Sequence, residues 1–103
     1  MDKEIKKMLD FIHQTPGAYL GKKTLTGLVD LIWGYVACMY QRDGNMPDFL
    51  QGFQEYVEEY YHLKDNEYVF RNWSDIINFF CKTEEEAFDK FYKLLDEFET
   101  QRG

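Results

Sequence analysis

Histidine and cysteine are scarce in this sequence, with two of each among 103 residues. His13 and His62 are far apart, and neither residue type occurs in an HxxxH or CxxC pattern. A metal centre needs several convergent ligands, and a thiol nucleophile needs a base and an activating environment beside it. There is also no GxSxG motif and no phosphate-binding loop. We therefore expect no catalytic residues, no metal and no cofactor.

Long apolar runs are absent as well. The longest candidate, residues 25–40, is interrupted by Asp30 and two glycines, and the first residues are charged rather than apolar. A membrane span needs about 18 consecutive apolar residues, so neither a span nor a signal peptide is expected. Cys38 and Cys81 each lie in an apolar stretch, which is typical of buried, reduced thiols. These features together predict a cytoplasmic protein without a disulfide.

Basic residues are outnumbered by acidic ones, 12 to 19, which leaves a net charge of -7. This balance argues against nucleic-acid binding, because phosphate backbones are held mainly by clustered Lys and Arg. Between residues 43 and 67 a single lysine, Lys64, stands among seven acids: Asp43, Asp48, Glu55, Glu58, Glu59, Asp65 and Glu67. Such a negative field favours encounter with a basic partner. The alternative is that these acids form solvated helix faces that keep the protein soluble.

Aromatic residues are abundant, at 18% of a chain that is 45% hydrophobic, enough for one globular domain with a core. Apolar residues recur at helical spacing in five segments, with Pro16 ending the first. We predict an all-α, compact single-domain bundle of about five helices spanning residues 1–103, with helices over 2–14, 25–41, 48–62, 73–81 and 84–100. Residues 64–71 connect two of them, as a loop or as a short extended segment. The oligomeric state stays open.

Local signals refine this scheme. Thr24 is expected to cap the second helix, and Thr83 with Glu86 forms a capping box for the fifth. The second helix is apolar on most sides, which predicts a central position. Gly27 and Gly34 lie seven residues apart on it, where missing side chains would let another helix pack closely. Gly otherwise costs about 1 kcal/mol inside a helix.

The third predicted helix combines tyrosines with carboxylates. Core packing accounts for Tyr56 and Tyr60, whereas the neighbouring acids and Tyr61 fit a surface that contacts a cationic protein. Candidate partner-binding residues are Glu55, Glu58, Glu59, Tyr61, Asp65 and Glu67. A hydrolase using paired carboxylates is a competing interpretation, which requires a cleft holding one carboxyl of raised pKa.

Five ordered motifs carry a family resemblance over nearly the whole chain: TPGAYLG (15–21), LTGLVDLIWGY (25–35), FLQGFQEYVEEYY (49–61), NWSDIINFF (72–80) and EEEAFDKFYKLLDEF (84–98). Their order resembles that in small bacterial immunity proteins encoded beside polymorphic or contact-dependent growth inhibition toxins. That family has PGMYLG, a GY-containing helix, a W..II segment and an EAF..F..LL.EF tail. This sequence departs from the pattern at Ala18, where Met is usual, and at Thr15, where Arg often precedes the proline.

The resemblance implies a function in binding rather than catalysis. Immunity proteins of this kind bind a cognate toxin domain and block it, so the implied partner is a basic toxin domain, with a nuclease as the leading case. The family's toxin contacts vary, and the resemblance therefore implies no particular binding residues. The alternative is a general helical interaction or adaptor module whose partner is not a toxin.

Overall fold

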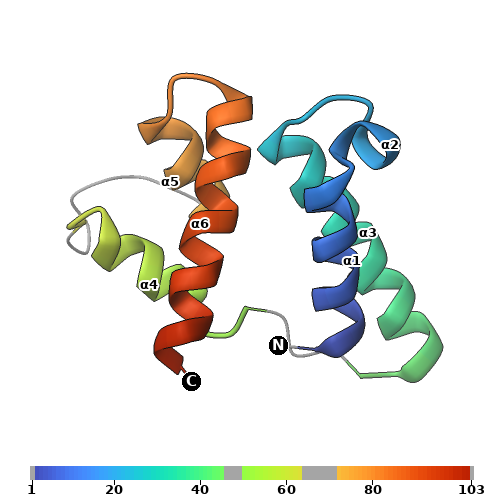
Figure 1. The fold of residues 1–103 in the computed structure, drawn as a ribbon. Helices are drawn as coiled ribbons and strands as arrows, with labels where there is room; N and C mark the ends of the chain where they lie inside the picture. Colours follow the sequence, from blue (N-terminus) through green and yellow to red (C-terminus); the bar gives the residue numbers. More distant parts are fainter. Residues whose placement is uncertain (1, 46–49, 64–71, 103) are drawn as a thin grey trace.

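The computed structural model describes residues 2–45, 50–63 and 72–102, and this part of the chain forms six helices without a strand (Figure 1). The helices are α1 (Lys3–Gln14), α2 (Pro16–Leu20), α3 (Leu25–Asp43), α4 (Phe53–Tyr60), α5 (Trp73–Phe80) and α6 (Glu84–Arg102). The prediction of an all-α bundle is confirmed. Five of the helices have eight residues or more. The remaining helix, α2, is short and lies within the 15–21 segment, where only a turn was expected.

Helix α6 lies between two groups of helices. Figure 1 shows α1, α2 and α3 on one side of it and α4 and α5 on the other. Helix α6 contacts α3, α4 and α5. Helix α3, which was expected to be central, buries one face only, and the side chains of Trp33 and Tyr40 on it are each 50% exposed. The expectation was wrong because α3 has apolar side chains on most of its sides, whereas the neighbouring helices cover only one side.

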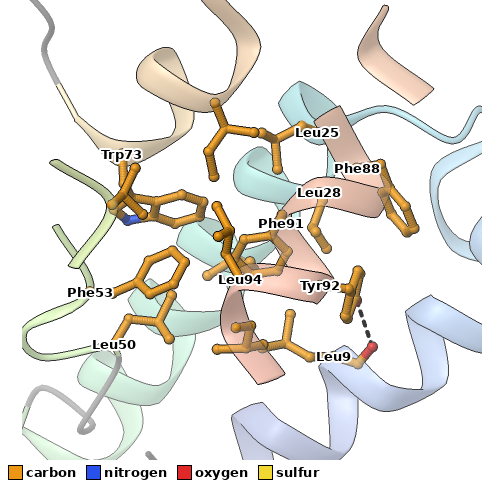
Figure 2. Packing of buried hydrophobic residues seen from close by; sticks show 14 of the residues in the cluster. Leu9, Leu25, Leu28, Leu50, Phe53, Trp73, Phe88, Phe91, Tyr92 and Leu94 are labelled. Atoms are coloured by element: carbon orange, nitrogen blue, oxygen red, sulfur yellow. Dashed lines mark hydrogen bonds between the residues drawn. The ribbon is translucent and has the colours of Figure 1, made fainter. Parts of the chain in front are cut away.

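The core is rich in aromatic side chains that meet across helices (Figure 2). The ring of Phe53 from α4 meets Phe91 of α6 edge to face, with centroids 5.8 Å apart, and Trp73 of α5 stacks on Phe91 at 5.0 Å. At the next position of α6, the Tyr92 hydroxyl donates a hydrogen bond to the backbone carbonyl of Leu9 in α1, at 2.6 Å. Helix α6 thus joins the two groups through buried side chains on two of its faces.

The predicted caps form. The Thr24 hydroxyl accepts from the Gly27 backbone N–H at 3.1 Å, and the Thr83 hydroxyl accepts from that of Glu86 at 3.1 Å. The reciprocal half of the second cap is shifted by one residue, because the Glu86 carboxylate accepts from the backbone N–H of Lys82 at 3.0 Å. Each contact satisfies a backbone donor that a helix terminus leaves unpaired.

Two further expectations are wrong. Within the described residues, a Cβ on Gly34 would meet nothing within 4 Å, and one on Gly27 would meet the capping hydroxyl of Thr24 at 2.8 Å and only one atom of another helix, Leu20 Cβ of α2, at 4.0 Å. Cys38 is exposed and Cys81 half-buried, and both are free thiols. The expectation for the cysteines was wrong because an apolar sequence environment was taken as evidence of burial.

Helix α4 is shorter than the predicted 48–62. It begins at Phe53, since Leu50 and Gly52 have φ values of +54° and +87°, outside the right-handed helical region. It ends at Tyr60, shortly before His62 at φ +58°. The predicted start at residue 48 and the connector at 64–71 lie outside the described residues. None of the helices in the described ranges combines the length and apolarity required to cross a bilayer.

Candidate functional site

Helix α4 presents a carboxylate-rich side to solvent. Phe53 and Val57, one turn apart, are fully buried, so the positions about half a turn from them lie on the other side of the helix. Glu55 and Glu59 are exposed there and Glu58 is half-buried. Three of the six predicted partner-binding residues therefore share one helix face. We call Glu55, Glu58 and Glu59 the acidic face.

Among the described residues, no ion pair neutralises the negative charge of the acidic face. Within the described residues, the ion pairs join Lys6 to Asp10, Lys23 to Asp89, and Arg42 to Glu4 and Asp43. None of them includes a carboxylate of the acidic face. These charges are consequently available to an approaching cation.

A shallow groove runs beside the acidic face, between α4 and α6. It has a volume of about 230 Å³ and is lined by Tyr56, Glu59, Tyr60 and Gln101. The Tyr56 hydroxyl lies 3.3 Å from Glu97 Oε2, to which it donates a hydrogen bond. Burial and then the nearby Glu97 carboxylate raise the pKa of Tyr56, so its hydroxyl keeps the proton that it donates. The tyrosine thereby holds the Glu97 carboxylate at the groove.

One cation contacts a tyrosine that lines this groove. Lys90 Nζ donates to the Tyr60 hydroxyl at 2.5 Å and lies 4.7 Å from the centroid of the same ring. Sequence reasoning missed Lys90, Glu97 and Gln101, because all three come from α6. Helical periodicity places them on an outward side of their own helix, but it does not predict which other helix packs against that side.

Tyr61 differs from the exposed contact residue that was expected. Its half-buried ring stacks on Phe80 with centroids 4.4 Å apart and an interplanar angle of 8°. Burial raises its pKa to about 12, and it also meets Tyr60 edge to face at 4.8 Å. Tyr61 thus fixes the end of α4 against α5. The last two predicted residues, Asp65 and Glu67, lie outside the described part of the chain.

Two further hollows lie away from the acidic face. One, of about 360 Å³, is lined by Glu4, Lys7, Met8, Phe11, Tyr19 and Tyr35, so the TPGAYLG segment contributes to it through Tyr19. Another, of about 340 Å³, follows α3 and is lined by Trp33, Val36, Ala37, Tyr40 and Gln41. Over residues 2–45, 50–63 and 72–102, no three His, Cys, Asp or Glu side chains are grouped so that they would hold a metal ion.

No protein-family model, curated protein or solved structure matches this chain. The resemblance to immunity proteins therefore stays a prediction that rests on the five motifs.

Proposed function

We propose that this chain is an immunity protein, which binds a cognate toxin domain with nuclease activity and neutralises it by covering its active or substrate-binding surface. The observation that carries the proposal is the acidic face of α4, whose carboxylates take part in no ion pair among the described residues. The order of the sequence motifs supports the same function.

Charge complementarity gives the physical reason. A nuclease holds the phosphate backbone of its substrate mainly with Lys and Arg side chains. A protein that presents Glu55, Glu58 and Glu59 on one helix face offers carboxylates to the same cations. Long-range attraction raises the association rate, and the tyrosines beside the carboxylates add contact area that slows dissociation. Inhibition by this route is stoichiometric, and no covalent bond is made or broken.

Charge reversal tests the proposal. The triple variant Glu55→Lys, Glu58→Lys, Glu59→Lys is compared with Asp30→Lys, Glu85→Lys, Asp96→Lys, which changes the net charge equally at exposed acids elsewhere. Each is co-expressed with the C-terminal toxin domain encoded beside this gene, and survival, co-purification and Kd at low salt are measured. The α4 triple should lose protection and bind at least about tenfold more weakly than the control, since each close charge pair across an interface contributes about 1.5 kcal/mol or more.

Three outcomes would count against it. If the two triple variants lost the same affinity, the effect would be due to the net charge of the protein and not to the acidic face. Unchanged affinity of the α4 triple would remove this face from the interface. A parent chain that neither binds nor protects against the neighbouring domain would remove the immunity function itself. Capture of a basic but harmless partner, with no effect on survival, would instead identify the alternative, a helical adaptor module.

A further inference from the structure

Helix α3 has an exposed side along much of its length. Its fully buried residues, such as Leu28 and Ile32, lie on another side of the helix. The exposed positions recur at intervals of three and four residues, which places them on one strip. We call them the α3 strip: Asp30, Trp33, Gly34, Ala37, Tyr40 and Gln41. The side chains of Trp33 and Tyr40 are each 50% exposed, so the strip is largely apolar.

The hollow on this strip has the form of a site for a side chain of another helix. It has a volume of about 340 Å³ and is lined by Trp33, Val36, Ala37, Tyr40 and Gln41. The first four residues stand at positions i, i+3, i+4 and i+7. In knobs-into-holes packing, four residues of one helix surround each side chain that a facing helix inserts. Trp33 and Tyr40 are about 10 Å apart along the helix axis, with Val36 and Ala37 between them. The geometry therefore indicates a helix as the occupant.

Charge selects which helix fits. Each copy of the chain has a net charge of -7, so two copies repel one another unless they meet where charges are few. The outward sides of α4 and α6 expose acids such as Glu55 and Glu59 on α4 and Glu85 and Asp96 on α6. Asp30 is the one charged residue of the α3 strip. A basic partner finds little charge complementarity there, whereas a second copy meets an equally uncharged surface.

We infer that the α3 strip binds the α3 strip of a second copy of this chain, as an antiparallel pair of helices with a two-fold axis beside Ala37. Trp33 and Tyr40 lie at similar distances, about 5 Å, on either side of this axis. Trp33 of each copy therefore meets Tyr40 of the other, which makes the strip self-complementary. The small side chain of Ala37 lets the two helices approach at the centre.

Asp30 determines the orientation of the pair. In the antiparallel pair the two Asp30 residues are about 20 Å apart along the helices, beyond the Debye length of about 8 Å at physiological ionic strength. A parallel pair would place them side by side. The strip is about 17 Å long, and one pair of helices of this length buries less than about 1,200 Å², which is typical of weak contacts. The dimer is therefore reversible and forms as concentration rises.

The inference goes beyond the proposed function. Figure 1 shows α3 and α4 on different sides of α6, so pairing through α3 leaves the acidic face of α4 accessible in both copies. Each copy in the dimer then keeps its own surface for a toxin domain, and the two activities are measured separately.

Sedimentation equilibrium at increasing concentration tests for the dimer. The average mass of the parent chain should rise from 12.5 kDa toward twice that value. Ala37→Glu and Ala18→Glu each place a carboxylate at an exposed alanine of a helix, but only Ala37 belongs to the α3 strip. Because Ala37→Glu brings two carboxylates together at the axis, it should weaken dimerisation at least about tenfold, and Ala18→Glu should behave as the parent chain.

Engineered cysteines test the orientation, in a chain whose own thiols are removed by Cys38→Ser and Cys81→Ser. Two cysteines form a disulfide only when their Cα atoms are within about 7 Å. With diamide as the oxidant, Ala37→Cys should form a covalent dimer, whereas Asp30→Cys should not. Circular dichroism checks that every variant folds, and if Ala37→Glu does not, the cysteine variants still decide the question.

Several results would overturn the inference. A mass that stays at 12.5 kDa at every concentration would show that the chain does not pair. Equal weakening by Ala37→Glu and Ala18→Glu would show that the contact lies elsewhere, and cross-linking through Asp30→Cys but not Ala37→Cys would show a parallel pair. If no dimer forms and Ala37→Glu weakens binding of the toxin domain, the strip belongs to the toxin interface, and the immunity function stands. If the dimer forms but no toxin domain binds, the immunity function falls and the dimer stands.

Discussion

Glu84, the first residue of α6, caps the amino end of α3 at Thr26, 58 positions earlier in the chain. Its Oε1 accepts from the Thr26 backbone N–H at 3.0 Å, and its Oε2 accepts from the Thr26 hydroxyl at 2.5 Å. The first N–H groups of a helix have no partner within the helix, and a carboxylate there also interacts favourably with the positive end of the helix dipole. One side chain thereby joins the starts of two helices that the sequence keeps far apart.

Glu84→Ala should lower the free energy of unfolding by about 1 kcal/mol, the usual cost of losing a side-chain cap. Glu85→Ala is the matched control, because Glu85 is exposed in the same first turn of α6 and makes no such bond among the described residues. Urea denaturation of the two variants checks the difference. Equal losses would show that only the negative charge at the start of α6 matters, and that its contact with α3 contributes nothing.

Tyr61 should make stability fall at alkaline pH. Its pKa is raised by burial from 10.0 to about 12 in the folded protein. Between these values the unfolded state has lost the proton and the folded state has kept it, so unfolding releases a proton and a rise in pH favours unfolding. Denaturation at a series of pH values should show this loss above pH 10. Tyr61→Phe should make the loss less steep, and Tyr92, whose pKa burial also raises, should account for part of the remainder. A variant that loses stability as steeply as the parent chain would contradict the assignment to Tyr61.

The same substitution should have opposite effects at two glycines of α3. Gly44 terminates the helix at φ +78°, where its N–H donates to the Tyr40 carbonyl, so Gly44→Ala should cost about 1 kcal/mol of stability. Gly34 lies in the helix interior with open space around its Cβ position, so Gly34→Ala should add up to about 1 kcal/mol. Chemical denaturation measures both. Destabilisation by Gly34→Ala would mean that another part of the chain covers this position.

The two thiols should differ in reactivity. Cys38 is exposed, whereas Cys81 is half-buried, and burial followed by the charge of Glu86 raises the pKa of its thiol. The thiolate is the reactive form, so iodoacetamide at pH 8 should label Cys38 faster than Cys81, because Cys81 is both less accessible and less ionised. Mass spectrometry of peptides gives both rates. In the Cys38→Ser variant the remaining thiol, Cys81, should be labelled slowly. Rapid labelling of this variant would contradict the burial of Cys81.

The helices themselves were readable from neighbouring residues. Ile5, Leu9 and Ile12 recur at helical spacing and all three are fully buried in α1. Thr24 and Thr83 cap the helices that they were expected to cap. These features depend on interactions between residues at most four positions apart, so a local pattern is sufficient to predict them.

The sequence by itself thus determined the all-helical fold class, the apolar side of each helix and the caps formed by Thr24 and Thr83. It also determined that Glu55, Glu58 and Glu59 lie together on α4. Only the tertiary structure decided that Lys90 and Glu97 meet the tyrosines of α4, that Tyr61 stacks on Phe80, and that Cys38 stays exposed. The reason is physical. A helix's own periodicity says which side is apolar, whereas the neighbour that covers that side depends on how whole faces fit one another.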